Sequence, residues 1–235
     1  VLNAMNSLNN PIPYAAGMEC DGKKEIIYFD QDNRDAQILS QLAPSFPDKT
    51  ITLGNWTDSN DRALLTIEDS SVVQEVFLLD LKQGSLKPIG RTSNVPKDRL
   101  HKMVSKKFTT RDGESIYGYL TKPKGKVERL IVYIHGGPYG IRDFDSYDFS
   151  EQYLASKGAA VLKVNYRGSG GYGTNFMEDA YKEWGGRLLN DIADAKIFNE
   201  IERKTPTVYF LDYDMKQAEV IVISKNEKLN TTLIP

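Results

Sequence analysis

The sequence contains little of what disulfide, zinc or membrane proteins require. Its 235 residues include one cysteine, Cys20, and two histidines, His101 and His135. A single cysteine cannot form an internal disulfide, and so few soft ligands argue against a structural zinc site. The longest apolar run of the second half, Leu130 to Ile134, is far shorter than the ~20 residues that cross a bilayer. We therefore expect no metal, no disulfide and no membrane-spanning segment.

A strong charge of either sign is also missing. Thirty Lys and Arg residues stand against 32 Asp and Glu residues, which gives a formal net charge of −2. No strong field gathers nucleic acid or anionic lipid, so neither is expected as a partner. With 40% apolar, 10% aromatic and 26% charged residues, the composition is that of a folded protein with one large or two small cores.

No charged stretch followed by an apolar stretch opens the chain, and residue 1 is Val rather than Met. This pattern lacks a secretory signal and favours a processed or truncated product. The compartment is therefore weakly constrained, with the cytoplasm slightly favoured. Nothing in the sequence predicts the oligomeric state.

Residues 1–104 are predicted to form a β-rich segment. Strand-length runs alternate there with polar turns, which is typical of antiparallel sheets. The runs are Glu25–Asp30, Thr50–Trp56, Arg62–Ile67 and Val73–Asp80. The first and last of these end 50 residues apart, close to the ~40 to 50 residues of a four-stranded propeller blade. We interpret the segment as propeller-like, with a β-sandwich or a meander as the alternative.

The pattern changes to an α/β type over residues 105–200. The continuous apolar run Arg129–Ile134 precedes a predicted helix near Ser150–Lys157, and a second buried run, Ala159–Val164, follows. Strand, helix and strand in this order indicate a parallel α/β sheet. Further helices are predicted over 174–184 and 188–201.

The last residues, 205–235, return to a β pattern. The runs Thr207–Asp212 and Glu219–Ile223 flank a polar turn and are typical of a β-hairpin. The first run ends in Tyr209-Phe-Leu-Asp212, which is similar to the strand end Tyr28-Phe-Asp30. We therefore predict that this hairpin pairs with the N-terminal β region and not with the apolar α/β strands.

Gly168 to Gly173 matches the G-x-G-x-x-G fingerprint of dinucleotide-binding proteins and follows a predicted strand. In that fingerprint the glycines open the helix, whereas here the predicted helix starts at Thr174, after the last glycine. We therefore expect no nicotinamide or flavin cofactor and interpret the segment as a sharp glycine turn. Dinucleotide binding is the minor alternative.

A second glycine motif, His135-Gly136-Gly137-Pro138, follows the apolar run that ends at Ile134. Glycines at the end of a buried strand leave backbone N–H groups open, where the oxyanion of an acyl-transfer reaction could bind. The alternative is a tight turn in which His135 is merely packed and hydrogen-bonded. The motif alone does not decide between these two interpretations.

A nucleophile does not accompany this motif. The chain contains no G-x-S-x-G sequence, and none of Ser146, Ser150, Ser156 and Ser169 has glycines at the spacing of a nucleophile elbow. The second histidine, His101, precedes every predicted α/β strand. A Ser, Asp and His set in the α/β-hydrolase order therefore cannot be assembled from this chain.

Two groups of carboxylates are interpreted as structural. The Asp30–Asp32 turn suggests a calcium loop, but Gln41 stands where the bidentate Glu belongs, which indicates a solvated turn. Asp191 and Asp194 lie three residues apart on a predicted helix. We expect Arg167 to pair with one of these two carboxylates in a structural role, rather than acid/base catalysis.

Four motifs occur in a distinctive order and spacing. They are His135-Gly-Gly-Pro138, Asn165-Tyr-Arg-Gly-Ser-Gly-Gly-Tyr-Gly173, Trp184-Gly-Gly186 and Asp191-Ile-Ala-Asp-Ala195. Together they resemble the prolyl oligopeptidase family of serine peptidases, in the branch of acylaminoacyl peptidases and dipeptidyl aminopeptidases. The resemblance covers about residues 20–195, because 25–90 is similar to the last blades of the family's propeller and 105–195 to the first part of its α/β-hydrolase domain.

The resemblance implies roles for the first motif. In the family the propeller limits access to a Ser-His-Asp site, and a backbone N–H of the His-Gly-Gly-Pro loop helps to bind the oxyanion. Gly137 inherits this role, while His135, Gly136 and Pro138 shape the loop. The nucleophile elbow, the acid and the histidine should follow, but from Lys196 onward the sequence departs from the family pattern.

We therefore predict a β-propeller-type segment joined to an incomplete α/β-hydrolase domain. The parent protein would be a serine peptidase that hydrolyses short or N-blocked peptides, with a peptide substrate as its partner, and this chain alone is expected to be inactive. One alternative is a non-catalytic pseudoenzyme or binding module. Another is an esterase, because the oxyanion loop does not distinguish esters from amides.

Overall fold

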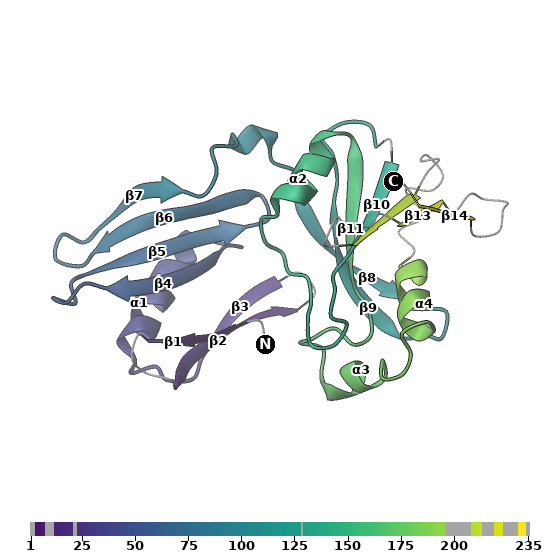
Figure 1. Cartoon of the computed structure of the whole chain (residues 1–235). Helices are drawn as coiled ribbons and strands as arrows, with labels where there is room; N and C mark the ends of the chain where they lie inside the picture. The colour runs from purple at the N-terminus through teal and green to yellow at the C-terminus, as the bar shows by residue number, and fades with distance from the viewer. Residues whose placement is uncertain are drawn as a thin grey trace. The chain divides into compact units, whose positions relative to one another are not determined.

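The computed structural model describes residues 3–7, 12–20, 23–127, 129–195, 208–212, 219–222 and 230–233. Contacts within the chain divide it into two compact units, residues 1–100 and residues 101–235 (Figure 1). Each unit has its own cluster of buried apolar side chains.

The first unit contains two antiparallel sheets. One has three strands in chain order, β1 (Asn3–Asn6), β2 (Pro13–Cys20) and β3 (Lys23–Tyr28). The other has four strands in chain order, β4 (Thr50–Trp56), β5 (Arg62–Asp69), β6 (Val72–Asp80) and β7 (Ser85–Arg91). The unit also contains two short 3₁₀ turns, Ala43–Ser45 and Lys97–Arg99.

The expected 50-residue spacing connects equivalent positions in the two sheets, because β3 and β6 are each the third strand. The turns that follow these strands also share their chemistry. The Asp30 carboxylate accepts hydrogen bonds from the backbone N–H groups of Asp32 (3.1 Å) and Asn33 (3.2 Å), and the Asp80 carboxylate accepts one from Gln83 (2.9 Å). The second sheet has the four antiparallel strands of a propeller blade, the first has three, and the described residues form no closed ring.

A helix that the sequence interpretation missed lies between the two sheets in the chain. Helix α1 (Arg34–Leu42) begins directly after the Asp30 turn, where Asn33 caps it by accepting hydrogen bonds from the N–H groups of Asp35 (2.9 Å) and Ala36 (3.3 Å). Its apolar face is short, with Ala36 and Leu39 fully buried. These contacts place α1 in a cluster with both sheets, whose buried members are Met5, Tyr14, Ala15, Ala36, Leu39, Ile51, Leu65 and Ile67.

The second unit is built on a mixed five-stranded sheet in the order β12-β10-β11-β9-β8. Its strands are β8 (Met103–Thr109), β9 (Ser115–Thr121), β10 (Arg129–Ile134), β11 (Ala159–Asn165) and β12 (Val208–Asp212). Strand β10 runs parallel to both neighbours, while β9 is antiparallel to β11 and to β8. The carboxyl ends of the three parallel strands therefore meet at one edge of the sheet.

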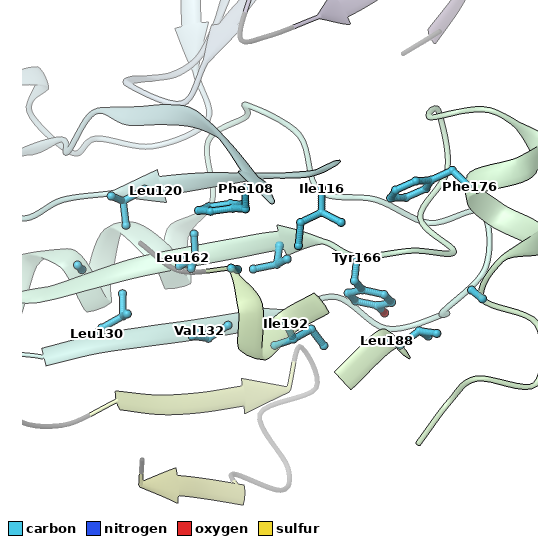
Figure 2. Packing of buried hydrophobic residues seen from close by; sticks show 14 residues of the cluster. Phe108, Ile116, Leu120, Leu130, Val132, Leu162, Tyr166, Phe176, Leu188 and Ile192 are labelled. Atoms are coloured by element: carbon cyan, nitrogen blue, oxygen red, sulfur yellow. The ribbon is translucent and has the colours of Figure 1, made fainter. Parts of the chain in front are cut away.

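Helices cover both faces of this sheet. Strand β11 is buried along its whole length, and alternate side chains face opposite sides. Leu162 packs in one cluster with Leu188 and Ile192 of α4 (Arg187–Asp194), whereas Lys163 on the other face forms an ion pair with Glu151 of α2 (Phe149–Ser156). Figure 2 shows the first face, which also includes Phe176 of α3 (Thr174–Glu178).

The prediction for the last residues is wrong. Strand β12 pairs in parallel with β10, in the register Leu130↔Val208 to Ile134↔Asp212, and β13 (Glu219–Val222) pairs with β14 (Asn230–Leu233) instead of with β12. An apolar strand that ends in Asp fits the edge of a parallel sheet as well as it fits a hairpin, and β10 has backbone groups there that need a partner. The intervening residues, 213–218, and Ile223 lie outside the described residues.

The predicted helix boundaries also shift. Helix α3 ends at Glu178, and the chain turns up to Gly186, whereas the sequence predicts a helix to Trp184. Helix α4 ends at Asp194, and Ile201 lies outside the described residues. In the described part of the chain, no helix combines the length and the hydropathy needed to span a bilayer.

Candidate functional site

The His135–Pro138 loop lies at the carboxyl end of β10. Its histidine is buried, at 5% exposure, while Gly136 and Gly137 are exposed. Gly137 has φ +129°, in the region that side chains avoid, and an added Cβ would lie 3.2 Å from the Tyr139 nitrogen. At Gly136, an added Cβ would meet nothing within 4 Å. Nothing in the described residues therefore requires glycine at 136 for packing.

The His135 ring contacts both the loop and the glycine-rich segment. Its Nδ1 donates to the Gly136 carbonyl (2.9 Å), and its Nε2 accepts from the Ser169 hydroxyl (3.1 Å). The ring stacks on Tyr166, with centroids 4.6 Å apart, and the Tyr166 hydroxyl donates to the His135 carbonyl (2.9 Å). Burial lowers the pKa of His135, which keeps the ring neutral at neutral pH.

The glycine-rich segment binds the loop that follows the His-Gly-Gly-Pro motif. The Gly140 N–H donates to the Gly168 carbonyl, and the Gly170 N–H donates to the Ile141 carbonyl, each at 3.0 Å. A Cβ on Gly170 would lie 2.4 Å from the Gly140 oxygen, so only glycine allows this close approach of the two backbones. The glycine-rich segment, 168–173, therefore holds residues 140–141 through two backbone hydrogen bonds, and we call this arrangement the glycine clasp.

This clasp explains the G-x-G-x-x-G sequence without a nucleotide. The N–H groups of Gly168, Ser169 and Gly170 donate to protein carbonyls, so they do not point toward a phosphate. Helix α3 has five residues and begins after its N-cap, Gly173. The geometry favours the glycine turn over the dinucleotide alternative.

Arg167 lies at the centre of a buried ion-pair network behind the clasp. Its backbone N–H donates to the Asp191 carboxylate (2.9 Å), and its Nη2 lies 2.6 Å from Asp191 Oδ1. Its Nη1 lies 2.6 Å from Asp112 Oδ2, in the turn between β8 and β9. Hydrogen bonds from Arg167 and Thr110 lower the pKa of Asp112 to about 2. The network joins the hairpin turn, the end of β11 and helix α4.

The other helix carboxylate, Asp194, pairs with Arg111, which the sequence analysis did not consider. Its carboxylate accepts hydrogen bonds from the backbone N–H (2.7 Å), Nε (2.8 Å) and Nη2 (2.8 Å) of Arg111. The side chain of Arg111 is 56% exposed and that of Asp194 is 3% exposed. Of the two helix carboxylates, Asp191 pairs with Arg167, and Asp194 fastens the adjacent residue of the same hairpin turn.

A second buried charge cluster lies on the α2 face of the sheet, and the sequence interpretation missed it. Lys163 lies 2.8 Å from Glu151 Oε2 and 3.2 Å from Asp148 Oδ2. Burial acts to lower the pKa of Lys163, but Glu151, Asp148 and Asp143 outweigh it and raise this pKa. Burial also raises the pKa of Asp143 to about 6. A lysine inside the apolar run Ala159–Val164 was the signal in the sequence.

Two other candidates, His101 and Ser156, form hydrogen bonds away from the His135–Pro138 loop. His101 lies at the start of the second unit, where its backbone N–H and carbonyl form hydrogen bonds with the Gln152 side chain (2.8 and 2.9 Å). The Ser156 hydroxyl donates to a backbone carbonyl of its own helix. Within the described residues, no three His, Cys, Asp or Glu side chains form a group that could hold a metal ion.

The chain matches known proteins in the region of this loop. Residues 145–198 match the model of the prolyl oligopeptidase family. The dipeptidyl aminopeptidase BIII of Pseudoxanthomonas mexicana is 38% identical over 98 residues, which are 37% of this chain and 14% of that protein. The acylamino-acid-releasing enzyme of Arabidopsis thaliana is 40% identical over 85 residues, which are 35% of this chain and 10% of that protein. The chain thus spans about a seventh or less of these relatives.

Solved structures show the same relationship. A puromycin hydrolase is 25% identical, with a TM-score of 0.53 over 72% of this chain and 27% of that chain. The Pyrococcus horikoshii acylaminoacyl peptidase is 23% identical, with a TM-score of 0.53 over 69% of this chain and 27% of that chain, a likeness that shows the fold alone. The resemblance seen in the four motifs is therefore confirmed: this part of the chain is similar to the prolyl oligopeptidase family of serine peptidases.

Proposed function

We propose that the second unit is the oxyanion-binding part of a serine peptidase domain, and that the first unit is the last blades of its propeller. The observation that carries the proposal is the loop at the carboxyl end of β10. Gly136 and Gly137 are exposed there, and the Gly137 N–H forms none of the backbone hydrogen bonds of the described loops. An open N–H at the end of the third strand of the sheet is the position of an oxyanion donor in α/β-hydrolases.

The neighbouring strand supports the proposal and limits it. Strand β12 lies parallel beside β10, and its last residue, Asp212, is level with Ile134. A nucleophile elbow that followed such a strand would lie beside the His135–Pro138 loop. The residues after Asp212 are Tyr-Asp-Met-Lys-Gln-Ala, without serine, cysteine or threonine. The proposed activity of the 235 residues is therefore oxyanion binding without a covalent nucleophile.

The proposed substrates are short or N-blocked peptides, because the relatives are named dipeptidyl aminopeptidase and acylamino-acid-releasing enzyme. The absence of a G-x-S-x-G sequence favours the second candidate, a non-catalytic relative that binds such peptides. An oxyanion donor serves esters and amides alike, so an esterase remains an outcome of the same assay.

The test is a chimera with a relative that supplies the missing nucleophile. Residues 103–195 would replace the corresponding segment of the Pseudoxanthomonas mexicana dipeptidyl aminopeptidase BIII, and hydrolysis of peptide and ester substrates would be measured. We expect an active chimera. Substituting Gly136→Ala in it should lower kcat by about 10², as for the loss of one oxyanion donor, because the new Cβ fills open space beside the peptide group that carries the Gly137 N–H.

The control for this substitution is its stability. An added Cβ at Gly136 has open space around it, so the melting temperature of the variant should not change. A folded chimera whose kcat is unaffected by Gly136→Ala would contradict the proposed role of the loop. Activity on esters without activity on peptides would favour the esterase alternative.

A further inference from the structure

Arg142 lies against two aromatic rings. Its guanidinium carbon is 4.7 Å from the ring centre of Tyr172 and 4.9 Å from that of Phe144, within the range of cation–π contacts. Tyr172 is itself held in place, because it stacks on Tyr117 with centroids 5.3 Å apart and its hydroxyl accepts a hydrogen bond from the Asn165 side chain (2.9 Å). The rings therefore restrict the movement of the guanidinium.

Hydrogen bonds fix the orientation of the guanidinium as well. Nε donates to the Asp143 carbonyl (3.3 Å), and Nη2 donates to the hydroxyl of Tyr119 (3.2 Å), which is a buried residue. At Gly171, which has φ +84°, an added Cβ would lie 2.7 Å from Arg142 Nη1. Glycine at this position therefore leaves room for the guanidinium, a role that the hydrogen bonds of the glycine clasp do not explain.

Arg142 has no ion-pair partner among the described residues. A guanidinium has five N–H groups, and its two hydrogen bonds use two of them, so three remain, including both on Nη1. The adjacent residue, Asp143, accepts from Arg142 with its backbone carbonyl and not with its carboxylate. Arg111 and Arg167, by contrast, each pair with a carboxylate. The partly buried charge of Arg142 therefore lacks a contacting counter-ion.

The position of Arg142 connects it with the proposed oxyanion site. Ile141, the residue before it, lies beside Gly137, because an added Cβ on Gly137 would be 3.5 Å from the Ile141 Cβ and Cδ1 atoms. The Ile141 carbonyl is held by the Gly170 N–H of the glycine clasp (3.0 Å). The charge of Arg142 also contributes, after burial, to the lowered pKa of His135. A fixed cation therefore lies near the loop that carries the Gly137 N–H.

We propose that Arg142 is a specificity-determining residue that binds a carboxylate of a peptide substrate through its free N–H groups. The planar fork of a guanidinium matches the two oxygens of a carboxylate, and such bidentate pairs are among the stronger hydrogen bonds in proteins. An arginine that is already held by its neighbours loses little further freedom when the ligand binds. This inference deepens the proposed function and rests on it for the identity of the ligand as a substrate.

The first test is binding of small peptides to the whole chain, followed by saturation transfer to the signals of the probe. N-acetyl-alanyl-alanine has a C-terminal carboxylate, its C-terminal amide has none, and N-acetyl-aspartyl amide has a side-chain carboxylate alone. We expect saturable binding of at least one acid and none of the dialanine amide, and the acid that binds identifies the source of the carboxylate. Equal binding of the amide, or no binding of either acid, would overturn the proposal.

Substitutions test whether Arg142 is the residue that binds the acid. Arg142→Gln should raise the Kd about tenfold or more, as for the loss of hydrogen bonds to a charged group. Arg111→Gln is the matched control, because it removes the same charge from an arginine that is already paired with Asp194, and it should not change the Kd. Arg142→Lys keeps the charge without the planar fork, so its Kd should also rise. An unchanged Kd in Arg142→Gln would refute the inference.

These readouts do not depend on catalysis. If Arg142→Gln does not fold, the difference between acid and amide in the unaltered chain and the Kd of Arg142→Lys still decide the matter.

In the chimera, the same substitution separates binding from chemistry. With a peptide substrate that has the preferred carboxylate, Arg142→Gln should raise KM about tenfold or more and leave kcat nearly unchanged. With the matching amide it should change neither. An equal effect on both substrates would refute carboxylate recognition alone, because Gly136→Ala tests the oxyanion role separately. An inactive chimera, together with a chain that binds the acid, would refute the proposed function and leave the carboxylate site intact.

Discussion

Arg167 shows how single residues hold the site together. Its side chain is 5% exposed and lies between Asp191, which is fully buried, and Asp112, which is 43% exposed. The sequence analysis could predict the pairing with the helix carboxylates because they lie three residues apart on one helical face. It could not predict Asp112, because this residue is far away in the sequence and its turn signal indicates only a hairpin.

Replacing Arg167 by alanine should destabilise the protein. The substitution leaves the buried Asp191 carboxylate without its charged partner, a loss of about 3 kcal/mol or more in the free energy of unfolding. Chemical denaturation measures this loss in the free energy of unfolding. Arg111→Ala is the matched control, because its guanidinium is about half exposed and the loss should be smaller. Equal stability of Arg167→Ala and the unaltered protein would contradict the structural role.

Asp143 should make the stability fall with rising pH. Its pKa in the folded protein is about 6, above the ordinary value, so the folded state binds the extra proton between about pH 4 and pH 6. Stability from this group is present below pH 4 and is lost as the pH rises through 6. Asp143→Asn should therefore be more stable than the unaltered protein at pH 7, by about 1 to 3 kcal/mol, and similar to it at pH 4.

Asp112 provides the control of opposite sign. Its pKa is lowered to about 2, so its stabilising contribution is present above pH 4 and is lost as the pH falls toward 2. Asp112→Asn should be less stable than the unaltered protein at pH 7, by a small amount because the carboxylate is partly exposed. Thermal unfolding of Asp143→Asn and Asp112→Asn at pH 4 and pH 7 measures both changes in stability. A change in the same direction for the two variants at pH 7 would contradict the account.

At the scale of elements, the sequence predicted the strands better than their partners. The runs at 50–56, 129–134 and 159–164 are strands as expected, because continuous or alternating apolar residues reflect burial directly. Pairing depends on contacts between distant residues, so β12 was assigned to the wrong sheet. Helix α1 was missed because its N-cap belongs to a polar turn and its buried face is limited to a few residues.

A cysteine pair tests the placement of β12. In a chain with Cys20→Ser, Ile131→Cys combined with Tyr209→Cys places two thiols at paired positions of neighbouring strands, where a disulfide can form on oxidation. Ile131→Cys with Phe210→Cys is the control, because adjacent residues of a strand face opposite sides of the sheet. Mass spectrometry of the oxidised protein should show a cross-link in the first pair alone. Equal cross-linking of both pairs would contradict the register.

The close approach of the Gly170 and Gly140 backbones predicts how a substitution of Gly170 changes stability. Gly170→Ala should destabilise the second unit by at least about 1 kcal/mol, because its Cβ would meet the Gly140 carbonyl and the two backbones would have to separate. Gly185→Ala is the control, since that residue has open space and no positive φ. Thermal unfolding of the two variants compares them. A neutral Gly170→Ala would show that the segments are not in close contact.

At the scale of the whole molecule, the four motifs predicted the similarity to the prolyl oligopeptidase family that the comparisons confirm. The His135–Pro138 motif lies at the carboxyl end of a buried parallel strand, as the apolar run before it predicts, and its glycines are exposed. The hydrogen bonds of the His135 ring could not be predicted, because Ser169 is distant in the sequence and its motif resembles a nucleotide site. The oxyanion role and the missing nucleophile are the central claim about this molecule.

Covalent labelling tests that claim most directly. A fluorophosphonate reacts with a serine that a neighbouring base activates. Ser169 is the serine to examine first, because its hydroxyl contacts the His135 ring, but it is fully buried. After incubation with the probe, intact mass spectrometry should show the unmodified 26.5 kDa chain, while the chimera that carries the relative's nucleophile gains one adduct. Stoichiometric labelling of a serine in the 235-residue chain itself would contradict the account.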